Sequence, residues 1–169
     1  MQRHLLKLAL LFLMQYSLAF ASESGPLKTS LPDGWKLEYT ETNGFDFYMA
    51  TPREVGDAVL FFNKCPVTMS PKDIPATLRK MADDISKKSE GYKEITGVSK
   101  KYELVAFGGE QCKGTYVDLK IISNTNKVRH LHIIFMMTVN GQIWAGHFQG
   151  TTEQWAQALG LLKSIRPFR

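Results

Sequence analysis

The chain has 169 residues and a formal net charge of +5, which is enough sequence for one globular domain with a substantial core. Its lysines and arginines are scattered and form no basic stripe, so the charge argues against nucleic acid as a partner. Acidic protein surfaces, anionic glycans and phospholipid head groups all stay compatible with such mild basicity, and the charge selects none of them.

The first 21 residues have the pattern of a cleavable secretory signal peptide. Arg3 and Lys7 lie in a start without acids, an apolar run covers residues 8–14, and Ala19-Phe20-Ala21 fits an A-x-A cleavage site. The apolar run is far shorter than the roughly 20 residues that cross a bilayer as a helix, so cleavage is favoured over an uncleaved membrane anchor. We therefore expect a periplasmic or secreted protein without stable membrane insertion.

After cleavage at Ala21, two parts are expected. Residues 22–30 are small and polar and should form a flexible leader. Residues 31–169 contain no linker or repeat, so we expect them to form a single domain.

Three strands are predicted at the start of this domain. Pro32-Asp33-Gly34 indicates a turn into a strand over residues 35–41. Asn43-Gly44 is typical of a tight hairpin because both residues tolerate positive φ, so residues 45–50 should return antiparallel. A third strand is expected over residues 58–63.

A helix is predicted next. Ser70 supplies an N-cap, Pro71 suits the first helical position and Asp73 places an acid in the first turn. Gly91 can adopt the left-handed conformation that ends a helix. The helix should pack through a single apolar stripe. That stripe comprises Ile74, Leu78, Met81, Ala82 and Ile85.

The second half of the domain predicts further antiparallel strands and a final helix. The helix should begin at Thr151, where Gln154 completes a capping box, and Pro167 should end it. Asn140-Gly141 indicates a tight turn between the last two strands. The strands are expected over residues 93–98, 102–107, 114–123, 128–139 and 142–148.

The fold class that follows is α+β. We expect an antiparallel sheet of about six to eight strands, built from hairpins, with helices packed on it. The strand over residues 128–139 carries apolar side chains on both faces, so cover is expected on both sides of the sheet.

Cys65 and Cys112 are the two cysteines of the chain. An even number of cysteines in an exported protein favours a disulfide over two separate buried thiols. In the chain-entropy model this bridge would stabilise the fold by about 4 kcal/mol. A cysteine nucleophile is the remaining alternative, and a bridge would remove it.

Three histidines form a candidate metal site. His130 and His132 are two residues apart on one predicted strand, so they point to the same face. A two-residue turn at Asn140-Gly141 would set Ile134 opposite His147, which places His147 diagonal to His132 on that face. Three imidazoles could hold zinc or copper with an open position. The alternative is that these histidines line the edge of a covered core.

The sequence carries no recognisable catalytic pattern. It has no G-x-S-x-G elbow, phosphate-binding glycine loop, H-E-x-x-H motif or calcium loop. We therefore expect a protein that is not an enzyme, without catalytic residues or a cofactor. Trp35, Tyr39 and Tyr48 could anchor a partner, although aromatic side chains in strands more often belong to the core. Partner-binding residues stay unassigned.

The order of elements resembles the PsbP-like superfamily, which includes the photosystem II extrinsic protein PsbP, the Ran-binding Mog protein and periplasmic proteins such as DcrB. The resemblance lies in Leu31-Pro32-Asp33-Gly34-Trp35, in the helix after the third strand, and in residues 143–148 leading into the last helix. It covers nearly all of residues 31–169. It implies an α/β/α sandwich whose members mostly bind proteins and have no catalytic residues. Some periplasmic immunity proteins that block cell-wall-degrading effectors are also similar.

The leading functional hypothesis is therefore a non-catalytic periplasmic or secreted module that binds another protein, for instance as an immunity or inhibitor protein against a cell-envelope effector. A metal-binding periplasmic protein that uses the three histidines is the first alternative. A hydrolase of an envelope polymer is the second.

Overall fold

The computed structural model describes residues 25–53, 58–65, 69–90, 95–123 and 129–168, with side chains except at residues 88–90, 95–102, 120–123 and 129–130. The expected signal peptide and its cleavage site lie outside the described residues.

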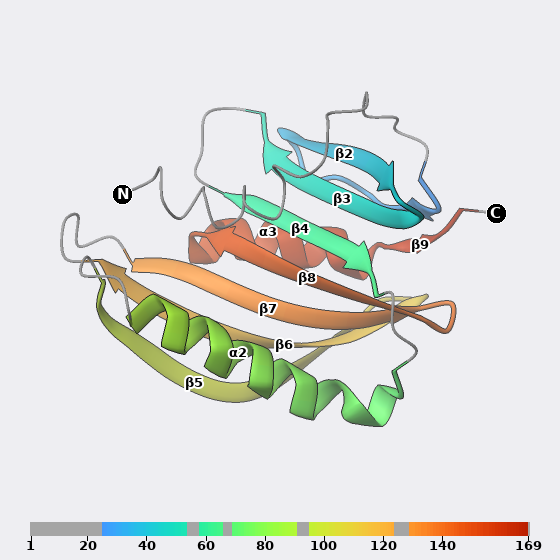
Figure 1. Cartoon of the computed structure of the whole chain (residues 1–169). Helices are drawn as coiled ribbons and strands as arrows, with labels where there is room; N and C mark the ends of the chain where they lie inside the picture. The colour runs from blue at the N-terminus through green and yellow to red at the C-terminus, as the bar shows by residue number, and fades with distance from the viewer. Residues whose placement is uncertain (1–24, 54–57, 66–68, 91–94, 124–128, 169) are drawn as a thin grey trace.

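A seven-stranded antiparallel sheet is the centre of the fold, with strand order β2-β3-β4-β8-β7-β6-β5 (Figure 1). Two consecutive runs of hairpins, β2 to β4 and β5 to β8, meet where β4 pairs with β8. The predicted fold class is confirmed. The strands are β2 (Trp35–Thr42), β3 (Phe45–Pro52), β4 (Val59–Lys64), β5 (Ile95–Gly108), β6 (Cys112–Ser123), β7 (Arg129–Val139) and β8 (Gln142–Gly150).

Both predicted Asn-Gly hairpins form. Asn43 and Gly44 have φ values of 53° and 77°, and Asn140 and Gly141 have φ values of 48° and 74°. Two successive residues with positive φ make the tight turn whose twist matches that of the flanking strands. The turns therefore fix the register of β2 on β3 and of β7 on β8.

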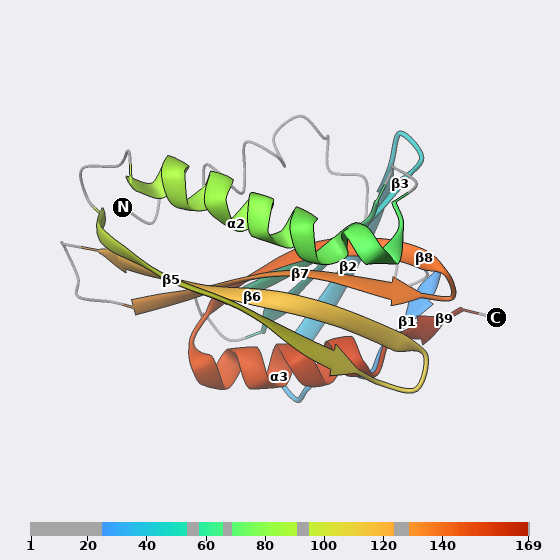
Figure 2. The same ribbon diagram turned by 90° about the horizontal axis from the view of Figure 1, so that it is seen from below.

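Two helices lie on opposite faces of the sheet, as Figure 2 shows. Helix α2 (Ile74–Glu90) follows a short 3-10 turn, η1 (Pro71–Asp73), which Ser70 caps as predicted. Helix α3 (Thr152–Lys163) begins with the predicted capping box between Thr151 and Gln154. We call the two sides of the sheet the α2 face and the α3 face.

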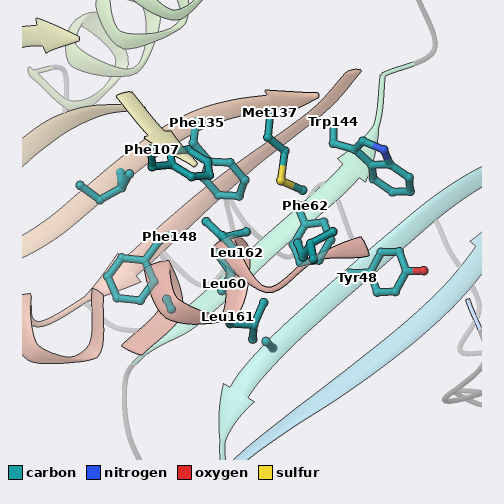
Figure 3. Packing of buried hydrophobic residues seen from close by; sticks show 14 of the residues in the cluster. Tyr48, Leu60, Phe62, Phe107, Phe135, Met137, Trp144, Phe148, Leu161 and Leu162 are labelled. Carbon is teal, nitrogen blue, oxygen red and sulfur yellow. The ribbon is translucent and has the colours of Figure 1, made fainter. Parts of the chain in front are cut away.

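The larger core lies on the α3 face and has members on all seven strands of the sheet. Figure 3 shows its central part. Alternate residues of β3, β4, β7 and β8 form this core together with the buried side of α3. Tyr48 stacks on Phe62 with ring centroids 4.9 Å apart, and Phe135 packs edge-on against Phe107. Burial of these large side chains supplies most of the driving force for folding on this side.

A smaller core lies on the α2 face. The apolar stripe of α2 packs on β5, β6 and β7, which confirms the predicted stripe. Leu78 and Ala82 are fully buried there, together with Ile134 and Met136 of β7. The helix therefore covers only the part of this face that β5 to β7 form.

The structure differs from the expected flexible leader over residues 22–30. Strand β1 (Leu27–Lys28) pairs with β9 (Arg166–Pro167) in a separate two-stranded ribbon. The Leu27 amide donates to the Tyr48 hydroxyl at 2.8 Å, and Thr29 Oγ1 donates to the Leu161 carbonyl at 2.8 Å. Residues 27–30 therefore belong to the fold, ahead of the expected boundary at residue 31, and residues 22–24 lie outside the described part of the chain.

Candidate functional site

The β7–β8 hairpin brings two of the three candidate histidines together. Ile134 pairs with His147, and His132 pairs with Gln149. This is the register expected from a two-residue turn at Asn140-Gly141, and it places His147 diagonal to His132 on the α2 face.

The side chains of His132 and His147, which we call the histidine pair, are in direct contact. His132 Nδ1 lies 3.1 Å from His147 Nε2, within hydrogen-bond distance. The two rings are stacked, with centroids 5.2 Å apart and planes inclined by 28°. His132 is buried and His147 is half-buried. Which nitrogen donates depends on the tautomers of the two rings.

Burial keeps the imidazole ring of His147 uncharged at neutral pH. Desolvation lowers the pKa of His147 from 6.5 to about 4, because a buried imidazolium loses the hydration that stabilises its charge. At neutral pH, the His147 ring therefore carries one N–H and one nitrogen with a lone pair.

The third candidate, His130, lies on β7 opposite Ile121, and its side chain is outside the described residues. In the described part of the chain, no three histidine, cysteine, aspartate or glutamate side chains gather as a metal site. The predicted three-histidine site thus stays a prediction, of which the structure places two members in contact.

The histidine pair lies at a border on the α2 face. On one side, His132 pairs with Leu119 of the core beneath α2. On the other side, His147 pairs with Phe61 of β4. Among the described elements, no helix lies over β3 and β4 on this side of the sheet (Figure 1).

An aromatic row occupies this part of the α2 face. We use the name for Phe45 and Phe47 of β3 and Phe61 of β4, all half-buried. The rings of Phe47 and Phe61 stack with centroids 5.9 Å apart, and those of Phe45 and Phe47 are 6.5 Å apart. The row therefore continues the α2 face from the histidine pair across β4 to the outer strands.

Sequence reasoning missed this row and named other aromatic side chains. Trp35 and Tyr48 are buried on the α3 face, where Tyr39 also packs, so the core interpretation holds for them. The alternation of Phe45 and Phe47 along β3 was the available signal. It needed the pairing of β3 with β4 to bring Phe61 alongside.

The predicted Cys65–Cys112 disulfide is wrong for this structure, in which both cysteines are free. Cys112 is buried in the core of the α3 face, with Sγ 3.6 Å from Met137 Sδ. Cys65 packs against the core of the α2 face. The sheet separates the two thiols. Burial raises the pKa of both, that of Cys112 to about 11, so neither has the low pKa of a reactive nucleophile.

Comparisons with known proteins give only distant structural likenesses. No protein-family model matches the chain, and no curated protein matches it. The crystal structure of LpqN, involved in cell envelope biogenesis of Mycobacterium tuberculosis, is similar with a TM-score of 0.44 and 10% sequence identity, over 85% of this chain and 83% of that chain. We transfer no function from a likeness of this size, and the PsbP-like resemblance stays a prediction.

Neither described helix has both the length and the apolar character that a membrane-spanning segment needs.

Proposed function

We propose that the protein is a non-catalytic periplasmic or secreted module that binds another protein through the part of its α2 face that neither described helix covers. The aromatic row is the observation that carries this proposal. Phe47 and Phe61 are half-buried and already stack on each other, so these two side chains have less conformational entropy to lose when a partner covers them.

The surroundings of the row resemble the layout of a protein interface. Glu38 of β2 pairs with Met49, which pairs with Phe61, so Glu38 lies on the same face as the row. Lys36 forms an ion pair with Glu38 at 2.9 Å, and both side chains are exposed. An apolar centre with a polar, solvated rim is typical of protein-binding surfaces.

The proposal that the protein is exported is based on the signal-peptide pattern of residues 1–21. That the protein is not an enzyme is likewise proposed. The finer role as an immunity or inhibitor protein against an envelope effector rests on the PsbP-like resemblance alone. No observation on the described residues favours the hydrolase alternative.

The test needs a partner and two matched phenylalanine variants. A partner recovered by affinity capture from the periplasm or culture fluid would be purified, and its affinity measured by calorimetry for the unaltered protein, Phe61→Ala and Phe168→Ala. Phe168 is the control because it is 51% exposed and lies beside Lys28, away from the row. Phe61→Ala should weaken binding by roughly tenfold or more, and Phe168→Ala should leave it unchanged.

Equal affinities for all three proteins would remove the aromatic row from the interface. Repeated capture without any stoichiometric partner would count against the binding function itself.

A further inference from the structure

The histidine pair presents two ring nitrogens at a spacing that one metal ion can bridge. His132 Nδ1 and His147 Nε2 are 3.1 Å apart. Imidazole nitrogens bind zinc at about 2.0–2.1 Å, so two such bonds across this gap enclose an angle of about 100° at the metal. That angle lies between the about 90° of square-planar and the about 109° of tetrahedral coordination.

The backbone holds both rings where such an ion would need them. Both residues lie inside paired strands, and the Asn140-Gly141 turn fixes the register between those strands. Ligands on paired strands are placed more precisely than ligands on loops. The contact between His132 Nδ1 and His147 Nε2 shows which nitrogen of each ring faces the other ring.

Metal binding requires one proton of the histidine pair to move, because a ring nitrogen that carries a proton cannot bind an ion. In the metal-free pair, one proton lies between the two nitrogens. When the donating ring changes tautomer, this proton moves to the other nitrogen of the same ring, and the ion can then bind between the two rings.

We propose that His132 and His147 form a two-histidine chelate for a divalent late first-row transition metal, with Cu²⁺ bound more tightly than Zn²⁺. Imidazole suits both ions, and the Irving–Williams order sets their ranking. Gln149 lies directly opposite His132 on the paired strand, so we include its amide oxygen, together with water, among the candidate ligands for the remaining positions. This inference is independent of the proposed protein-binding function.

The first experiment titrates the purified, chelator-treated protein with Cu²⁺ and separately with Zn²⁺ by calorimetry. One ion per chain is expected, with Cu²⁺ at least about tenfold tighter. Electron paramagnetic resonance of the Cu²⁺ form should show coupling to two imidazole nitrogens. His132→Gln and His147→Gln should each weaken Cu²⁺ binding on the order of 100-fold, since loss of groups that merely orient ligands already costs 10–100-fold.

His130→Gln is the matched control on the same strand. Unchanged affinity in this variant supports the two-histidine chelate, and a loss in all three variants supports a chelate that His130 completes. Binding that survives in both His132→Gln and His147→Gln, or is lost only in His130→Gln, overturns the proposal. So does weak binding of several ions per chain, which indicates adventitious surface sites.

A measurement on the unaltered protein covers the case in which a variant does not fold. Substoichiometric Cu²⁺ should broaden the amide NMR signals of Ile134 and Gln149 before those of Asn43 and Gly44, which lie in the turn of the outer hairpin. Broadening that begins at the outer hairpin would place the ion elsewhere and overturn the assignment.

Discussion

The two faces of the seven-stranded sheet are formed by alternate residues of the same strands, but they differ in how much of each face is covered by a helix. On the α3 face, one core runs from Trp35 at one edge to Phe107 at the other, with α3 packed on it. On the α2 face, the helix covers β5 to β7 and leaves the histidine pair and the aromatic row at and beyond its border. The α3 face is thus closed by a continuous core, whereas part of the α2 face has no helix over it among the described elements.

The largest expected effect is a difference in stability between alanine variants of two adjacent residues of β4. Phe62 is 1% exposed on the α3 face, whereas Phe61 is half-buried on the α2 face. Phe62→Ala should lower the free energy of unfolding by about 3–5 kcal/mol because it opens a cavity in a sealed core. Phe61→Ala should lower it by only about 1 kcal/mol. Urea unfolding of both variants measures the difference, and similar losses would mean that the two faces are equally closed.

The next effect is a pH dependence that belongs to the α2 face. The pKa of His147 is about 4 in the folded protein and close to 6.5 when unfolded. The unfolded chain therefore binds a proton first as the pH falls, and the metal-free protein should lose stability between pH 6.5 and 4, by at most about 3 kcal/mol. Above pH 6.5 this contribution is complete.

His147→Gln provides the control for that experiment, since glutamine does not titrate in this range. Chemical unfolding in the presence of a chelator would be followed at several pH values for both proteins. Curves that run parallel from pH 6.5 to 4 would show that His147 is already charged in the fold.

A glycine comparison tests how tightly the α3 face is packed. A Cβ on Gly146 of β8 would meet the side chains of Phe135 and Phe62 and the Phe61 carbonyl, whereas one on Gly160 of α3 would meet open space. Gly146→Ala should therefore destabilise by about 1–3 kcal/mol through overpacking. Gly160→Ala should stabilise by about 0.5–1 kcal/mol through helix propensity. Thermal melts measure both changes. Melting temperatures that shift in the same direction for the two variants would contradict this account of the core.

The last prediction is that a reducing agent has no effect on stability. Because Cys65 and Cys112 lie on opposite faces of the sheet, a reducing agent should leave the melting temperature of the purified protein unchanged. Thiol titration in denaturant without reductant should find two free thiols per chain. A reductant-dependent fall in the melting temperature would indicate a bridge, and with it a different packing of the two faces.

Local signals account for what the sequence predicted correctly. Asn-Gly pairs fix hairpins, Thr151 and Gln154 fix the start of a helix, and a two-residue turn fixes which side chains of β7 and β8 are neighbours. The contact between His132 and His147 was predictable for that reason. Each of these inferences spans only a short stretch of chain.

Non-local pairing accounts for most of what the sequence did not predict. The pairing of β4 with β8 joins segments far apart in the chain, and it alone brings Phe61 beside His147. The ribbon between Leu27 and Pro167 joins the two ends in the same way. The even number of cysteines carried no information about the face on which each one lies. Residues 95–108 form one long strand with a register shift between Lys101 and Val105, where two strands were expected.

The ribbon between β1 and β9 also sets the order in which the fold can be completed. Leu27 pairs with Pro167, and the Ser30 amide donates to Ser164 Oγ at 2.8 Å. A chain that emerges N-terminus first from a ribosome cannot make these contacts until residues 164–167 are free. Strand β1 therefore pairs only after β9 has emerged, when the seven strands of the main sheet have already been synthesised.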